Sequence, residues 1–190
     1  LARKCRQLNR RFFHNQLKQK PYVLLQWAQT ADGYIDRIRE IGSNEKALQV
    51  SNKHSSRIVH KIRSEVDAIL IGAQTALLDS PQLTTRHFPG RSPIKVLLDP
   101  DGRVPNQNQL LKANSLHFVD STSERTGANK VAIEWGPKGL DRVLNELYNR
   151  GIRSVLVEGG AFTLRQFIQS GNWNEALVIQ NKKTILEGVP

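Results

Sequence analysis

Residues 155–164 read Val-Leu-Val-Glu-Gly-Gly-Ala-Phe-Thr-Leu, a short apolar run that meets two glycines and continues in a helical pattern. Such a stretch is typical of a buried strand that passes directly into a helix. The first turn of that helix has unpaired N–H groups, which favour an anion such as a nucleotide phosphate. The alternative is an ordinary strand-to-helix junction at which the glycines only ease packing. Taken alone, the stretch leaves both interpretations open.

The same alternation of apolar runs and helical patterns continues through the rest of the chain. Strands are expected at residues 22–28, 68–71, 94–98, 116–119, 131–133, 154–157 and 176–179. Helices are expected at residues 51–63 and 140–148 and from the paired glycines through residue 168. Strands that alternate with helices predict an α/β fold with a mostly parallel sheet covered by helices.

The positive charge is concentrated at one end of the chain. The 190 residues have a formal net charge of +11, and residues 1–20 supply +7 of it because they contain seven Lys or Arg and no acid. We therefore expect a basic helical arm at residues 1–20 and one folded domain at residues 21–190. The remaining +4 suits small phosphorylated ligands at least as well as a nucleic acid, whose binders usually carry a basic patch across the fold.

Several chemistries lack the residues that they need. Cys5 is the only cysteine, which excludes an internal disulfide or cysteine zinc site and agrees with a reducing, cytoplasmic location. The five histidines are scattered, so we interpret each as a surface or satisfied core residue and expect no metal. No apolar run has membrane-span length, and no export signal, nucleophile-elbow or P-loop motif occurs.

A second stretch, residues 67–86, begins as a buried strand that ends at Gly72. Thr75 lies at the expected start of a helix, Asp79 follows one turn later, and Arg86 follows a proline-containing turn. A hydroxyl, a carboxylate and a guanidinium near one strand end suit a polyol phosphate, because arginine binds phosphate through two hydrogen bonds. The alternative is that Asp79 caps a turn and Arg86 is solvated.

A third stretch, residues 25–36, is a strand that runs into an Asp-Gly turn at residues 32–33. Ala28, near the strand end, is small enough to let a flat ring approach. The alternative is a hairpin or loop turn that needs no function.

Three motifs therefore occur in order along the chain. They are Trp-Ala-Gln-Thr-Ala-Asp-Gly at 27–33, Asp-Ala-Ile-Leu-Ile-Gly at 67–72 with Asp-Ser-Pro-Gln-Leu-Thr-Thr-Arg at 79–86, and Val-Glu-Gly-Gly at 157–160. Together they resemble the reductase domain of the bifunctional riboflavin biosynthesis deaminase–reductases, and the arm resembles the linker between the two domains. The resemblance implies a three-layer, dihydrofolate-reductase-like α/β fold with helices on both faces of the sheet. It also implies a deaminase domain in the full-length protein and a homodimer.

The resemblance further implies an activity and a set of site residues. The reaction would be the NADPH-dependent reduction of 5-amino-6-(5-phosphoribosylamino)uracil, by hydride transfer to C1′ of the sugar. The positions implied to contact the cofactor are Ala28, Gln49, Thr75, Asp79, Gly159, Gly160, Ala161, Phe162 and Thr163. The positions implied to contact the substrate are Arg63, Leu83, Arg86 and Glu158. We expect Asp79 also to support proton transfer to the departing ring oxygen, directly or through water.

Two other functions compete with this one. A related reductase could act on another pyrimidine or a pterin, although Arg63 and Arg86 argue for a phosphorylated substrate. A nucleotide- or RNA-binding module could instead use the basic arm; we expect neither a nucleic acid nor a membrane as partner.

The chain also departs from the family at particular positions. Gln49 corresponds only approximately to the family pattern, and the family's last strands are expected to be missing after Ile179. The choice between NADPH and NADH stays open, with Lys95 or Arg103 as a candidate contact for the 2′-phosphate.

Overall fold

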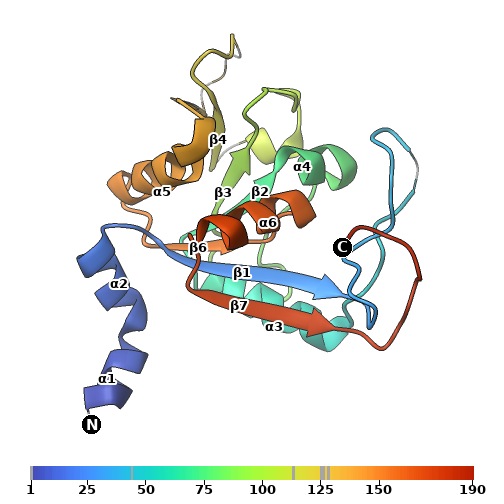
Figure 1. The fold of residues 1–190 in the computed structure, drawn as a ribbon, viewed down its shortest axis with the longest axis horizontal. Coiled ribbons are helices and arrows are strands. Elements are labelled where there is room, and N and C mark those ends of the chain that lie inside the picture. Colours follow the sequence, from blue (N-terminus) through green and yellow to red (C-terminus); the bar gives the residue numbers. More distant parts are fainter. Residues whose placement is uncertain (1, 44, 113, 125–126, 128) are drawn as a thin grey trace.

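The computed structural model describes residues 2–43, 45–112, 114–124, 127 and 129–190. Its seven strands form one sheet in the order β5-β4-β3-β2-β6-β1-β7, and every neighbouring pair is parallel (Figure 1). The strands are β1 (Tyr22–Gln29), β2 (Ala68–Gly72), β3 (Ile94–Leu98), β4 (Ser115–Asp120), β5 (Lys130–Ile133), β6 (Ser154–Val157) and β7 (Glu175–Gln180). The predicted strands are confirmed to within one residue at each end.

The helices are α1 (Ala2–Leu8), α2 (Arg10–Lys18), α3 (Lys53–Ser64), α4 (Ala73–Asp79), α5 (Gly139–Asn149) and α6 (Ala161–Ser170). Two short 3₁₀ helices, η1 (Gln109–Leu111) and η2 (Gly136–Lys138), complete the described elements. Asn52 sets the start of α3, because its Oδ1 accepts a hydrogen bond from the Ser55 N–H at 2.9 Å while Ser55 Oγ accepts one from the Asn52 N–H at 2.9 Å. This capping box places Arg63 in the last turn of α3.

Helices cover both faces of the sheet, which makes the three layers that the resemblance implied. Leu70 of β2 packs in the cluster that includes residues of α5 and α6. Its neighbours Ile69 and Ile71 pack in the opposite cluster, with residues of α3 and α4. Successive side chains of a strand point to opposite faces, so a central strand between two helical layers must be apolar throughout. Burial of each such Leu or Ile contributes about 1.5–3 kcal/mol.

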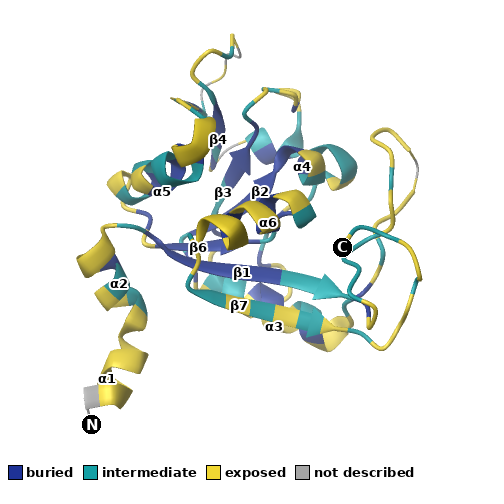
Figure 2. Cartoon of the chain, viewed as in Figure 1, coloured by how far each residue is buried: buried dark blue, intermediate teal, exposed yellow. Residues whose placement is uncertain are grey.

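The basic arm is two helices, whereas the sequence suggested one. The break falls at Asn9, whose backbone leaves the helical conformation (φ −100°, ψ 19°), although its N–H still donates to the Cys5 carbonyl at 3.1 Å beside the side-chain Nδ2 at 3.0 Å. α1 extends away from the sheet, and Leu8 and Phe12 are exposed (Figures 1 and 2). The arm is attached to the domain through Asn15, whose Nδ2 donates to the Arg153 carbonyl at 2.9 Å.

The loop after β1 is tied to the segment after β7. The Ile35 N–H donates to the Val189 carbonyl at 2.8 Å, and the Val189 N–H donates to the Asp36 carbonyl at 2.8 Å. The Asp-Gly turn at residues 32–33 is part of this loop and joins no hairpin, since both neighbours of β1 in the sheet are parallel strands. The two segments therefore hold each other beside the carboxyl end of β1 (Figure 1).

Candidate active site

The three sequence motifs meet at one edge of the sheet. β2, β6 and β1 are consecutive in the strand order, so Gly72, Glu158 and the end of β1 near Ala28 share the carboxyl edge. Ligands of parallel α/β sheets bind at this edge, outside the strand ends. The sheet order thus brings together stretches that are far apart in the chain.

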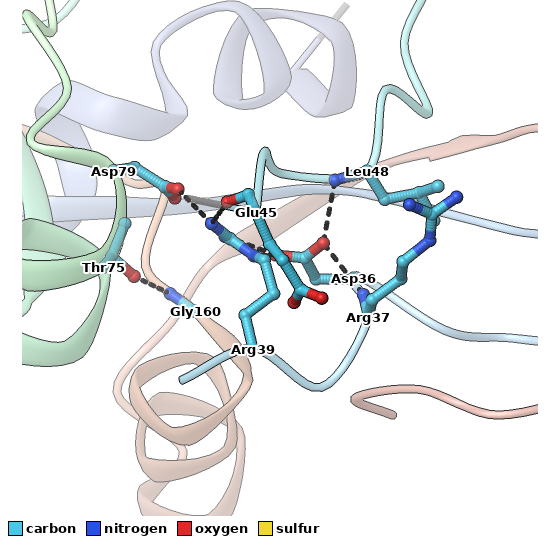
Figure 3. Close-up of polar contacts among 8 residues, drawn as sticks. All are labelled: Asp36, Arg37, Arg39, Glu45, Leu48, Thr75, Asp79 and Gly160. Carbon is cyan, nitrogen blue, oxygen red and sulfur yellow. Dashed lines mark hydrogen bonds and ion pairs between the residues drawn. The ribbon is translucent and has the colours of Figure 1, made fainter. Parts of the chain in front are cut away.

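The junction between β6 and α6 is joined to α4 by a hydrogen bond. The Gly160 N–H donates to Thr75 Oγ1 at 3.0 Å (Figure 3). Because the N-cap residue of α6 is Gly160, no N-cap side chain bonds the first-turn N–H groups from Ala161 to Thr163, and N–H groups at such a position suit an anion. Phe162, in this first turn, is 71% exposed. This geometry fits the phosphates of a dinucleotide.

The glycines at this junction are also required by packing. A Cβ added to Gly159 would lie 2.6 Å from Thr163 Cβ, and one added to Gly160 would lie 3.0 Å from Thr75 Oγ1. The packing alternative drawn from the sequence is therefore confirmed for these glycines, and anion binding at the start of α6 stays a prediction.

Arg63 and Glu158, both expected to contact substrate, contact each other. Arg63 Nε and Nη2 lie 2.8 and 2.5 Å from the two carboxylate oxygens of Glu158. Arg63 Nη1 also donates to the Thr84 carbonyl at 3.0 Å. The two side chains are only 12% and 11% exposed, so the geometry fixes the carboxylate at the end of β6.

The other residues expected to contact the substrate follow α4. Leu83 is buried and has a φ of +52°, a left-handed conformation that turns the backbone at this point. Arg86 is exposed, and its Nη1 donates to Gln82 Oε1 at 2.8 Å. Gln49 is exposed, and among the described residues its side-chain hydrogen bonds go to Ser51 rather than to the junction. The structure therefore does not bring Gln49 into contact with the other expected site residues.

Asp79 has a partner that the sequence did not suggest. Arg39 Nη1 lies 2.8 Å from Asp79 Oδ1, and Arg39 Nη2 lies 2.5 Å from Asp36 Oδ2 (Figure 3). Burial by itself lowers the pKa of Arg39, but the hydrogen bonds and negative charges of Asp79 and Asp36 outweigh it and raise that pKa. The sequence around a basic loop residue does not indicate which distant carboxylate it will contact, so the Arg39–Asp79 ion pair is found only in the folded chain.

Two histidines of the domain are buried, and they differ. His117 is a satisfied core residue, since its Nε2 lies 2.9 Å from Asp99 Oδ2. The interpretation of every histidine as exposed or satisfied is wrong for His60, whose buried Nδ1 has no hydrogen-bond partner among the described residues. Burial, and then the charges of Arg63 and Arg86, lower the pKa of His60 to about 4. This histidine is neutral at physiological pH.

The candidate contacts for a 2′-phosphate lie at different ends of β3. Lys95 is near the amino end of the strand, away from the edge at which the motifs meet, whereas Arg103 follows the carboxyl end and is exposed. Among the described residues, no cluster of three or more His, Cys, Asp or Glu could hold a metal ion. In the same part of the chain, no helix has both the length and the apolar character needed to cross a bilayer.

Comparison with known proteins agrees with this architecture. The chain is 30% identical over 193 residues to the riboflavin biosynthesis protein RibD of Aquifex aeolicus, covering 97% of this chain and 53% of that protein. It is 31% identical over 172 residues to the 2,5-diamino-6-ribosylamino-4(3H)-pyrimidinone 5′-phosphate reductase of Methanothermobacter thermautotrophicus, covering 84% and 76% of the two chains. The chain thus spans about half the length of the first of these relatives.

A solved structure from Thermotoga maritima superposes with a TM-score of 0.83 at 28% identity, over 98% of this chain and 52% of that one. That protein is described as a diaminohydroxyphosphoribosylaminopyrimidine deaminase/5-amino-6-(5-phosphoribosylamino)uracil reductase. The similarity confirms the dihydrofolate-reductase-like α/β fold. Residues 21–185, nearly the whole chain after the basic arm, match the model of the RibD C-terminal domain. The chain therefore belongs to the RibD C-terminal domain family.

Proposed function

We propose that this chain reduces 5-amino-6-(5-phosphoribosylamino)uracil to 5-amino-6-(5-phosphoribitylamino)uracil with NADPH, a step of riboflavin biosynthesis. The observation that supports it most is the junction at which Gly160 bonds Thr75 beside the Arg63–Glu158 pair. An uncapped helix start and a fixed carboxylate at one sheet edge suit an anionic cofactor next to a polar substrate.

The cofactor contacts follow from the junction. The first-turn N–H groups of α6, with Gly159 and Gly160, suit the pyrophosphate, and Ala28 leaves room for the nicotinamide ring. NADPH supplies the hydride when bound, so the protein's tasks are to bind, orient and exclude water. Arg103, exposed after β3, is the better placed candidate for the 2′-phosphate.

The substrate contacts divide by charge. Glu158, oriented by Arg63, can accept hydrogen bonds from N–H or hydroxyl groups of the substrate. Arg86 is exposed and its Nη1 donates to the neutral amide of Gln82, so its positive charge is available to a phosphate. Asp79 is bonded to the Arg39 guanidinium, so it suits the role of a carboxylate acceptor that orients a water near the sugar.

A second substrate is favoured by a specific observation. The Methanothermobacter relative is named as a reductase of the 2,5-diamino-pyrimidinone, which has an amino group where the uracil compound has a carbonyl oxygen. The two substrates differ at the pyrimidine ring and share the ribose 5-phosphate. The same Arg86 and Glu158 could serve both compounds, so the assay must offer both.

The proposal also covers the domain organisation, the oligomeric state and the location of the protein. The deaminase activity named for the Thermotoga protein supports a deaminase domain as the partner of residues 21–190, with residues 1–20 as the connecting arm. A homodimer and a cytoplasmic location complete the proposal and would be tested by light scattering and by fractionation of cells.

The first experiment is a titration of the purified chain with NADPH and with NADH, followed by nicotinamide fluorescence at moderate salt. Saturable binding that prefers NADPH is expected, and absorbance at 340 nm should then fall when either pyrimidine substrate is added. A folded chain that binds neither nucleotide, or that binds NADPH and reduces neither substrate, would overturn the proposal.

A further inference from the structure

Arg39 lies between two carboxylates that come from different parts of the fold. Its Nη1 is 2.8 Å from Asp79 Oδ1 on α4, while its Nε and Nη2 are 2.8 and 2.5 Å from Asp36 Oδ2 in the loop after β1 (Figure 3). The Arg39 side chain is only 3% exposed, whereas Asp79 remains 32% exposed. The guanidinium is therefore buried behind a carboxylate that still faces solvent at the site.

Asp36 anchors Arg39 from the other side. Asp36 Oδ1 accepts hydrogen bonds from the N–H groups of Arg37 and Leu48, each at 2.8 Å, so it closes the loop on itself. The backbone of Asp36 is bridged to Val189. Asp36 is thus held through both its side chain and its backbone. Because Arg39 bonds Asp36 and Asp79 at once, the fixed position of Asp36 also restricts the position of the Asp79 carboxylate.

Asp79 needs a nearby cation for a local reason. It is the last residue of α4, and the C-terminal end of a helix has partial negative charge that disfavours a carboxylate. Thr75, one turn earlier on the same helix, accepts the Gly160 hydrogen bond. Asp79 therefore lies on the same short helix, α4, as Thr75, the residue that holds the β6–α6 junction through Gly160.

We propose that Arg39 is a positioning residue for the reduction. By bonding both Asp36 and Asp79, it holds the Asp79 carboxylate in its orientation beside the junction between β6 and α6. This inference rests on the proposed function, because it assigns Arg39 a role in that same site. Arg39 acts through Asp79 and touches neither substrate nor cofactor. Its loss should lower kcat more than it raises KM, since binding groups stay in place.

The test compares Arg39→Gln with Asp79→Asn, the double variant and the control Arg37→Gln, whose exposed side chain points away from Asp79 (Figure 3). Initial rates of NADPH oxidation are measured over a range of pyrimidine substrate concentrations to give kcat and KM, NADPH affinity is measured by fluorescence, and folding by the thermal midpoint. We expect Arg39→Gln to lower kcat about ten- to a hundredfold, with NADPH affinity within about twofold of wild type and Arg37→Gln unchanged. A fall in kcat with little change in KM is the signature of a positioning role, since a general loss of folding would also weaken NADPH binding.

The double variant decides whether Arg39 works through Asp79. Equal kcat for Asp79→Asn and for the double variant is expected, and multiplied losses would overturn the inference. Arg39→Lys keeps the charge without the fork and is the second variant if Arg39→Gln does not fold; its kcat should still fall, and wild-type kcat would overturn the inference. A folded wild type that reduces neither substrate refutes the proposed function and this role together, whereas an active wild type with an unaffected Arg39 variant refutes this role alone.

Discussion

Arg63 and Glu158 lie 95 residues apart in the chain and form a bidentate ion pair at the end of β6. Each side chain is nearly nine-tenths buried. Because burial removes water from both charges, each depends on the other for its stabilisation. The pair therefore couples α3 to β6 and fixes a carboxylate at the site, so it has both a structural and a functional consequence.

Removal of one partner should be costly. Glu158→Gln leaves the buried Arg63 charge without a carboxylate, so we expect a loss of about 2–4 kcal/mol in the free energy of unfolding and a raised KM for the substrate. Urea unfolding and initial rates measure the two effects. The exposed Arg150–Glu146 pair supplies the control, since Glu146→Gln should cost less than about 1 kcal/mol. Equal losses at the two sites would contradict the assignment.

Thr75 should act through one hydroxyl oxygen. Thr75→Val keeps the shape but removes the acceptor of the Gly160 N–H, which costs about 1–3 kcal/mol when that N–H finds no other partner. We expect weaker NADPH binding, because the loop before α6 is no longer held. Fluorescence titration measures the change, and Thr75→Ser, which retains the hydroxyl, is the matched control. The prediction is wrong if Thr75→Ser binds as weakly as Thr75→Val.

His60 should make stability depend on pH. Its folded pKa of about 4 lies below the ordinary value of 6.5, so the unfolded chain binds the proton first. Above about pH 6.5 the ring is neutral in both the folded and the unfolded chain, so its titration leaves stability unchanged there, and stability falls by up to about 1.4 kcal/mol per pH unit as the pH drops from there toward 4. Urea unfolding at pH 7, 5.5 and 4.5 measures this slope.

The control for that slope lies on the same helix. His60→Gln should flatten the dependence between pH 6.5 and 4, whereas His54→Gln, which changes an exposed histidine of α3, should leave it as in the wild type. An unchanged slope in His60→Gln would show that other groups cause the acid sensitivity.

The core prediction compares two leucines of opposite exposure. Leu156 of β6 is 0% exposed and Leu8 of the arm is 83% exposed. Leu156→Ala should lower the free energy of unfolding by about 2–5 kcal/mol, since it removes contacts and leaves a cavity. Leu8→Ala should change it by less than about 0.5 kcal/mol. Chemical denaturation of both variants checks the contrast, and a large effect of Leu8→Ala would indicate that the arm packs in solution.

Local patterns were enough to predict most of the elements. The spacing of Val143, Leu144 and Leu147 predicted α5 to within a residue at each end, because the buried side of a helix repeats every 3.6 residues. The continuous apolar run of β2 likewise predicted a strand covered on both faces. The arm was predicted less well, since the backbone leaves the helical conformation at Asn9 and divides the arm into two helices.

The site divides in a similar way. Thr75, Gly160 and Glu158 could be named from motifs because each follows a strand end, and strand ends are visible in sequence. Arg39 could not be named, because its loop has no periodic pattern and its two partners are Asp36 nearby and Asp79 on another element. The burial of His60 Nδ1, which has no hydrogen-bond partner among the described residues, could not be predicted either, since it depends on which residues pack around α3.

The α/β alternation, the parallel sheet and the resemblance that led to the reductase proposal could be predicted from the residues alone, because these depend on residue types at short and regular spacings. The charge pairs, Arg63 with Glu158 and Arg39 with both Asp36 and Asp79, became known only from the folded chain. An ion pair forms where two side chains approach within a few ångströms, and that approach depends on strand order and loop path. Neither the strand order nor the loop path can be predicted from the residues that flank each charged side chain in the sequence.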